Sequence, residues 1–242
     1  MFGFLKTKIT PLVGVDISSS AIKILELSRA HGRYVVENYG IEFLPSQSVV
    51  ERNIKDVNKV GEAIRNLMKR MGCKLPFAAV AVAGSSVLTR VIQLNADLNE
   101  LEMADQIEVE ADRYIPYPLE EVYYDFEVLD PVLKRPEFVN VLLAVTRIET
   151  LDMRVAAIVD AGLQATVVDV EALAMERAFG LIGEHLPTKG AGSNVAVIDL
   201  GSTNSTLYVF KDRRLIYSRD QAFGGKHLSD EIQRRYGLSA EE

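Results

Sequence analysis

The sequence lacks several features that mark whole classes of protein. A single cysteine, Cys73, among 242 residues excludes an internal disulfide framework and a cysteine-rich metal site. Tryptophan is absent, and the three histidines do not have the spacing of metal ligands. No apolar run approaches the ~20 residues that a membrane-spanning helix needs. We therefore expect no direct membrane span.

Positively charged residues are also fewer than negatively charged ones. Lysine and arginine number 27 against 34 aspartates and glutamates, which gives a formal net charge of −7. No basic block interrupts this balance, so nucleic acid is not an expected partner. The glycine patterns GxGxxG and GxxxxGK[ST] are missing as well, which removes the common dinucleotide and P-loop signatures. The hydrophobic share of 48% is that of an ordinary globular α/β chain.

The sequence does contain two loops of small residues, each following an apolar strand that ends in aspartate. The residues of interest in the first loop are Asp16, Ser18, Ser19 and Ser20, and those in the second are Asp199, Gly201, Ser202 and Thr203. Hydroxyl groups and exposed amides suit phosphate oxygens, and carboxylates suit a hydrated Mg²⁺ ion. Either loop alone is adequately explained as an ordinary turn. Their occurrence at the same point of a repeated unit favours a shared nucleotide site.

Further residues fall near these loops along the chain. Lys23 either reaches back to phosphate or is simply solvated. Gly224 and Gly225 allow close backbone approach and open a helix whose N-terminus favours anions. Asp169 ends another predicted strand and is the one candidate catalytic residue, although an ordinary structural role stays open. Glu171 fits better as a first-turn acid that stabilises a helix N-terminus.

The order of predicted elements indicates a repeat with an insertion. Strands over 12–17, 21–28 and 34–43 form an antiparallel meander. Asp56 is expected to cap a helix that runs to Met71 and stops at Gly72.

Residues 85–162 have their own strand–helix–strand–strand–helix pattern and are predicted to be an inserted subdomain. Asn99 and Glu102 are expected to form a capping box ahead of one helix that ends near Tyr114. Strands over 122–129 and 138–146 are expected to be joined by a proline- and charge-rich loop. The apolar run 114–119 is expected to cover the core of this subdomain, with a partner groove beside it as the alternative.

After a glycine-rich linker at 189–193, the chain begins again with strand, Asp-led turn, strand and strand. A full second copy needs another helix and further strands, so we expect 191–242 to be an incomplete second half.

Several segments resemble one family of actin-like proteins. GVDISSSAIKILELS, VAVAGSSV, EADRYIPYPLEEVYYDFEVL, VVDVEALAMERAF and FGGKHLSDEIQRRYGLSAEE are closely similar to the PilM family of type IV pilus assembly proteins, which is related to the cell-division protein FtsA. The resemblance implies an actin-like (ribonuclease H-like) α/β fold with duplicated domains. It places 1–84 and 163–190 in the first core subdomain, 85–162 in an FtsA-type inserted subdomain, and 191–242 at the start of a second.

The same resemblance implies a cytoplasmic scaffold that binds ATP and Mg²⁺. Its partner would be the cytoplasmic N-terminal tail of the inner-membrane protein PilN. By resemblance, the tail would dock in a groove between the first core subdomain and the inserted one, so that the chain is held at the membrane through that partner. Both aspartates would hold Mg²⁺ through water. The phosphate contacts carried over by position are Asp16, Ser18, Ser19, Ser20, Lys23, Asp199, Gly201, Ser202, Thr203, Gly224 and Gly225.

Two departures and two alternatives accompany this assignment. Many relatives have glycine where this chain has Ser202 and Thr203, and the adenosine-binding glycine-rich segment of the superfamily is missing. A small-molecule kinase of the same superfamily is one alternative, and an FtsA-like filament protein is the other. A kinase needs a base aimed at an acceptor hydroxyl, for which Asp169 is the one candidate. We expect slow ATP hydrolysis at most, and self-association stays open.

Overall fold

The computed structural model describes residues 11–190 and 192–239 and divides the chain into two compact units. The first unit combines Met1–Val82 with Met153–Glu242, and the second is Ala83–Asp152. Ala191, within the expected linker and at the expected domain boundary, lies outside the described residues. Residues 240–242, which end the last of the family-like segments, lie outside them as well. No helix in the described part is long and apolar enough to cross a membrane.

The larger sheet of the first unit has five strands in the order β10-β6-β1-β2-β3. β2 is antiparallel to both β1 and β3, whereas β6 runs parallel to β1 and β10 runs parallel to β6. Alternating side chains of β1 enter the core, which leaves Asp16 exposed at its carboxyl end. The strands are β1 Val13–Ile17, β2 Ala21–Ala30, β3 Arg33–Phe43, β6 Phe77–Val82 and β10 Gln164–Val170.

Two helices cover the core of this sheet. Helix α1 (Val57–Met71) begins at the predicted cap Asp56, whose side chain accepts from an amide of the first turn, and it ends at Gly72 in the left-handed region. Helix α4 (Ile148–Asp160) contributes the fully buried Ala157 and Ile158 to the same core. Most of α4 therefore belongs with the first unit, whereas the predicted inserted subdomain extended through it to 162.

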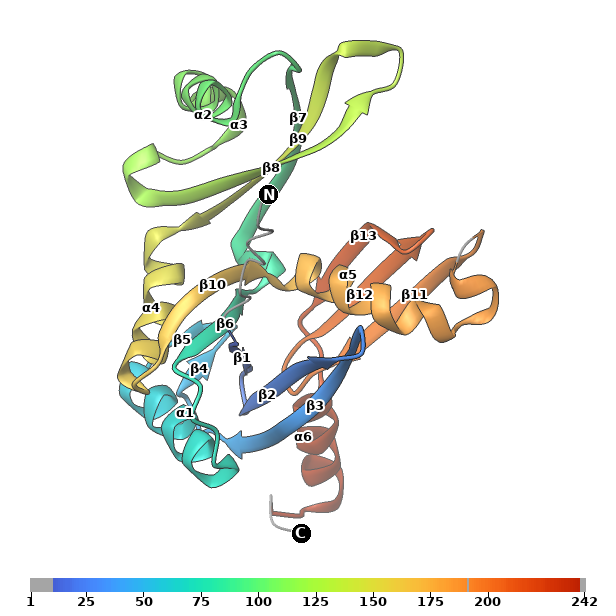
Figure 1. The fold of residues 1–242 in the computed structure, drawn as a ribbon. Helices are drawn as coiled ribbons and strands as arrows, with labels where there is room; N and C mark the ends of the chain where they lie inside the picture. Colours follow the sequence, from blue (N-terminus) through green and yellow to red (C-terminus); the bar gives the residue numbers. More distant parts are fainter. Residues whose placement is uncertain (1–10, 191, 240–242) are drawn as a thin grey trace. The chain divides into compact units, whose positions relative to one another are not determined.

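The second sheet repeats the meander of the first, with the strand order β11-β12-β13 and antiparallel pairing throughout. Helix α5 (Glu171–Ile182) packs on it (Figure 1). The Phe179 and Phe210 rings stack with centroids 4.1 Å apart. This confirms the predicted repeat, with a second half that is incomplete within the described residues. The remaining elements are β11 Asn194–Leu200, β12 Ser205–Lys211, β13 Arg214–Gln221 and α6 Gly225–Tyr236.

The second unit is a three-stranded antiparallel sheet covered by helix α2. Its strands run in the order β7-β9-β8, and Asn99 and Glu102 form the predicted capping box at the start of α2. The predicted single helix is broken at Glu110, and a short helix α3 follows the break. The bounds are β7 Val87–Asn95, α2 Glu100–Val109, α3 Ala111–Tyr114, β8 Val122–Val132 and β9 Arg135–Arg147.

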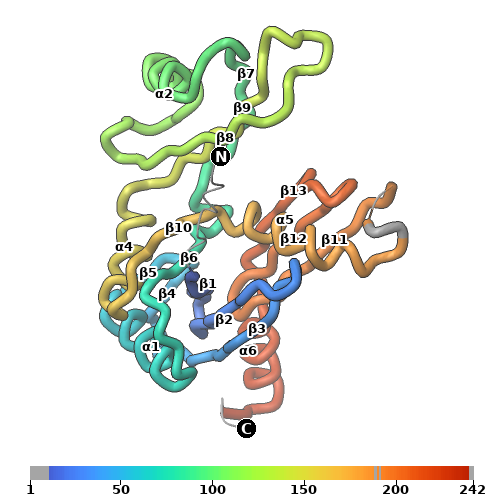
Figure 2. The backbone as a smooth tube through the Cα atoms, viewed as in Figure 1, coloured from blue at the N-terminus to red at the C-terminus, as the bar shows by residue number. Residues whose placement is uncertain are grey.

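Two local predictions for this unit had different outcomes. A proline- and charge-rich loop was expected between the last two strands, but β8 and β9 continue to a tight turn at Leu133 and Lys134 (Figure 2). Pro131 is accommodated by a shift in the β8–β9 register. The apolar run before β8 covers the core of the unit as predicted, because Ile115 is buried, while Tyr117 stays 39% exposed.

A small hairpin in the first unit was not predicted. Strands β4 (Val49–Val50) and β5 (Asn53–Ile54) are joined by Glu51 and Arg52. Both turn residues have positive φ angles, 49° and 65°. This is the conformation of a two-residue hairpin turn, in which asparagine and glycine are the usual residues. The usual sequence signal was therefore absent.

Candidate functional site

The two Asp-led loops are closed by equivalent backbone hydrogen bonds. In the first, the amide of Ser18 donates to the carbonyl of Ala21 at 3.1 Å. In the second, the amide of Gly201 donates to the carbonyl of Asn204 at 2.9 Å. Each loop thus closes a four-residue turn between an Asp-bearing strand and its hairpin partner.

The middle residues of both turns present unused donors. Within the described chain, no acceptor engages the amides of Ser19 and Ser20, or those of Ser202 and Thr203. All four residues are partly exposed. Neighbouring unpaired amides beside hydroxyl groups form the kind of concave donor set that binds anions. The donor chemistry therefore fits a phosphate group at each loop.

The loops also touch each other. The hydroxyl of Thr203 donates to the hydroxyl of Ser19 at 3.0 Å, although the two residues are far apart in the sequence. The structure therefore brings the two predicted phosphate loops together in the first unit.

The charges of both aspartates act on Lys23. It is the register partner of Asp16, and its ammonium donates to that carboxylate at 3.0 Å. The hydrogen bond to Asp16 raises the pKa of Lys23 despite a smaller opposing effect of burial, and the charge of Asp199 acts in the same direction. Both aspartates are exposed, so each carboxylate stays accessible to a hydrated ion. The described residues contain no cluster of three His, Cys, Asp or Glu side chains that would bind a metal directly.

Gly224 and Gly225 hold the second loop from the start of α6. The amides of Gly225 and Lys226 donate to the carbonyls of Gly201 and Ser202 at 3.0 and 2.8 Å. A Cβ at Gly224 would lie 2.4 Å from the Ser202 carbonyl oxygen, so only glycine permits this contact. The first-turn amides of α6 are thus used to fix the loop, a role that the anion-site interpretation of this helix entry did not include.

Glu171 is an acid in the first turn of α5, as predicted, but it also contacts the loop region, whereas Asp169, whose role was left open, does not. Asp169 accepts from Arg177 at 2.6 Å and from the amide of Val170, so its carboxylate is held locally. Glu171 instead accepts from Arg52 at 2.6 Å and lies within electrostatic range of Asp16. Burial raises the pKa of Glu171, and the charge of Arg52 partly offsets that rise. Glu171 is therefore the acid that shares the surroundings of the loops.

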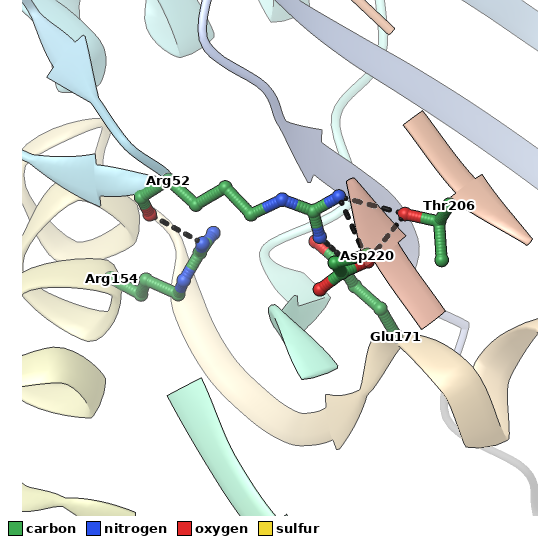
Figure 3. A network of polar contacts seen from close by, with 5 residues as sticks. All are labelled: Arg52, Arg154, Glu171, Thr206 and Asp220. Atoms are coloured by element: carbon green, nitrogen blue, oxygen red, sulfur yellow. Dashed lines mark hydrogen bonds and ion pairs between the residues drawn. The ribbon is translucent and has the colours of Figure 1, made fainter. Parts of the chain in front are cut away.

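Arg52 is a site residue that sequence reasoning missed (Figure 3). From the β4–β5 turn, its guanidinium donates to Glu171 and, at 2.9 Å, to the hydroxyl of Thr206. It also lies 3.5 Å from the carboxylate of Asp220, which accepts from the same hydroxyl at 2.7 Å. The Arg52 side chain is only 16% exposed. The network joins the β4–β5 hairpin to strands β12 and β13 of the second sheet.

Arg154 supports this network from below the turn. It is 2% exposed and donates to the carbonyl of Arg52 at 3.0 Å (Figure 3). Burial lowers the pKa of Arg154, and the charges of Glu171 and Asp16 act against that decrease. Since a buried guanidinium is costly unless bonded, this contact fixes the backbone from which Arg52 projects.

Comparison with known proteins is consistent with this architecture. The solved PilM-PilN type IV pilus biogenesis complex matches with a TM-score of 0.77 and 24% identity, over 95% of this chain and 67% of that chain. The ethanolamine utilization protein EutJ from Carboxydothermus hydrogenoformans matches with a TM-score of 0.50 and 14% identity, over 95% of this chain and 58% of that one. These likenesses establish an actin-like fold. The model of the family described as type IV pilus assembly protein PilM matches residues 14–242, and the chain therefore belongs to that family.

Proposed function

We propose that this chain is a nucleotide-responsive scaffold of type IV pilus assembly. The phosphates of ATP bind between the two loops, Mg²⁺ neutralises part of their charge, and the second unit docks a partner's peptide. The observation that carries the proposal is the pair of matching loops, each with unused amides and each headed by an exposed aspartate.

The Asp16–Lys23 pair is suited to opening when a ligand arrives. The two side chains are 51% and 56% exposed, and exposed ion pairs contribute only about 0–1 kcal/mol. A phosphate can take the ammonium of Lys23 while Asp16 turns to water around the metal ion. The weak ion pair between Lys23 and Asp16 is thereby replaced by two attractive interactions, one between Lys23 and the phosphate and one between Asp16 and the hydrated metal ion.

The second loop contributes a carboxylate and hydroxyls to the same site. Asp199 lies within electrostatic range of Lys23, and Ser202 and Thr203 supply hydroxyl groups beside their free amides. Gly224 and Gly225 act here by holding the loop rather than by touching phosphate. Ser18 acts similarly in the first loop, because its hydroxyl donates to Ala21 at 2.8 Å.

The kinase alternative receives no support from the geometry. Its base would be Asp169, whose two carboxylate oxygens are already bonded by Arg177 and a backbone amide. Both contacts hold this carboxylate against its own strand and the following helix, whereas a general base must come within hydrogen-bond reach of the acceptor hydroxyl. We therefore favour nucleotide binding with slow hydrolysis at most.

PilN is the partner that we propose for the second unit. The support is family membership together with the solved PilM-PilN complex of similar fold. On this unit, Tyr117 lies under the guanidinium of Arg147 at 4.9 Å and remains partly exposed. An aromatic ring with an arginine on its face is typical of binding hot spots. Docking there would hold the chain at the cytoplasmic face of the inner membrane.

The test is calorimetric titration of a synthetic PilN N-terminal tail peptide into this chain, with and without ATP and Mg²⁺. We expect saturable binding whose affinity changes with nucleotide. Tyr117→Ala should weaken binding about tenfold or more, as loss of a hot-spot aromatic does. Leu133→Ala, at the 91% exposed β8–β9 turn of the same unit, is the matched control. Absence of peptide binding in both conditions would remove the scaffold proposal.

A further inference from the structure

The internal repeat shows that the two loops differ at one charged position. Lys23 pairs with Asp16 across β1 and β2, and Thr206 pairs with Asp199 across β11 and β12. Thr206 therefore stands in the second half where Lys23 stands in the first. The second loop has no cation on its own outgoing strand at that position.

Arg52 brings a cation to that position from the β4–β5 hairpin. Its guanidinium donates to the hydroxyl of Thr206 at 2.9 Å and approaches Asp220 on the neighbouring strand. With the Asn204 amide in the orientation that satisfies both of its ends, its oxygen accepts from Arg52 Nε at 3.1 Å. Because Asn204 closes the second loop, Arg52 contacts both the loop and the strand that follows it.

The backbone that presents Arg52 is strained and firmly held. Glu51 and Arg52 both adopt the left-handed region, which costs non-glycine residues on the order of 1–2 kcal/mol each. Such a conformation persists where the surroundings determine it. Here the surroundings are the buried Arg154, bonded to the Arg52 carbonyl, and Glu171, bonded to its guanidinium.

We propose that Arg52 is a positioning residue for the second loop, supplying from the β4–β5 hairpin the charged anchor that Lys23 supplies on the first loop's own strand. The inference rests on the proposed nucleotide site. Arg52 does not touch the ligand. It sets where Ser202 and Thr203 stand relative to the first loop, so that both loops reach one phosphate chain.

This role requires the planar guanidinium group of arginine, whose donors point in fixed, divergent directions. One guanidinium bonds Glu171 in the first half and Thr206 in the second at the same time. A lysine ammonium carries the same charge but lacks the fixed, divergent donors. Arg52→Lys should therefore behave much more like Arg52→Gln than like the unchanged chain.

The test is amide hydrogen exchange of the four free loop amides, followed by NMR with and without ATP and Mg²⁺. In the unchanged chain we expect the ligand to protect Ser19 and Ser20 as well as Ser202 and Thr203. In Arg52→Gln, protection of the second pair should fall about tenfold, the effect of losing a charged hydrogen bond. Protection of the first pair should persist, a loop-specific result that general destabilisation does not give.

Two further variants make the outcome decisive. Thr206→Val removes the hydroxyl that accepts from Arg52 and donates to Asp220, while keeping the shape of the side chain. It should reduce protection of the second loop even if Arg52→Gln folds poorly. Arg65→Gln breaks an ion pair with Asp160 that lies within the first half and should leave both loops protected. Equal protection of both loops in Arg52→Gln and Thr206→Val overturns this inference and leaves the nucleotide site standing. No protection of either loop in the unchanged chain overturns the nucleotide site itself.

Discussion

Tyr208 shows how burial at a single residue sets a response to pH. It lies 4% exposed in the core between α5 and the second sheet. Burial raises the pKa of Tyr208 to about 12, with the negative charge of Glu171 acting in the same direction. The folded chain thus keeps the phenol proton at pH values where the unfolded chain has lost it.

This pKa predicts a loss of stability at high pH. Between pH 10 and about 12, the unfolded state ionises Tyr208 while the folded state does not, so rising pH favours unfolding. Relative to Tyr208→Phe, the unchanged chain should lose roughly 2–3 kcal/mol of unfolding free energy across this window. Urea unfolding of both proteins at several pH values measures the difference. A difference that stays constant with pH would contradict the assignment.

The residues of the loops were predictable because they carry their own signals. Asp16 and Asp199 each end an apolar run and precede small residues, and repetition of that pattern identified the pair. Arg52 had no such signal. Its turn lacks glycine and asparagine, and its partners Glu171 and Thr206 are distant in the sequence. Such a contact is set by tertiary packing, which a local pattern does not report.

At the scale of elements, the prediction of a helix or strand was accurate where capping or turn residues marked its ends. Helix α1 was predicted accurately because Asp56 and Gly72 mark its ends. The break between α2 and α3 at Glu110 has no proline or glycine, so the sequence predicted one continuous helix there. Pro131 and Pro136 predicted a loop, yet both lie within strands, because a register shift absorbs the missing donor at Pro131.

Helix α5 is the element that anchors the second sheet. Phe179 is 2% exposed and stacks on Phe210 with an interplanar angle of 13°. Phe179→Ala should lower the unfolding free energy by about 3–5 kcal/mol, as large-to-small changes of buried aromatics do. Leu181→Ala, on the same helix but 53% exposed, should cost well under half as much. Chemical denaturation compares the two, and equal losses would mean that the stack does not anchor the sheet.

For the whole molecule, the proposal links two ligands through one chain. If ATP changes the affinity for the PilN peptide by some factor, the peptide must change the affinity for ATP by the same factor. The separate core of the second unit allows it to bind a peptide while the loops of the first unit bind phosphates. Titrations in both orders therefore check each other.

The central claim is that two Asp-led loops form one site for ATP and Mg²⁺. The direct measurement is calorimetric titration of ATP, with and without Mg²⁺, into this chain, the double variant Asp16→Asn/Asp199→Asn, and the exposed-helix control Glu62→Gln. We predict Mg²⁺-dependent binding that the double variant weakens about 10–100-fold, as loss of outer-shell metal partners does, while the control binds normally. A double variant that keeps the affinity and Mg²⁺ dependence of the unchanged chain would contradict the account.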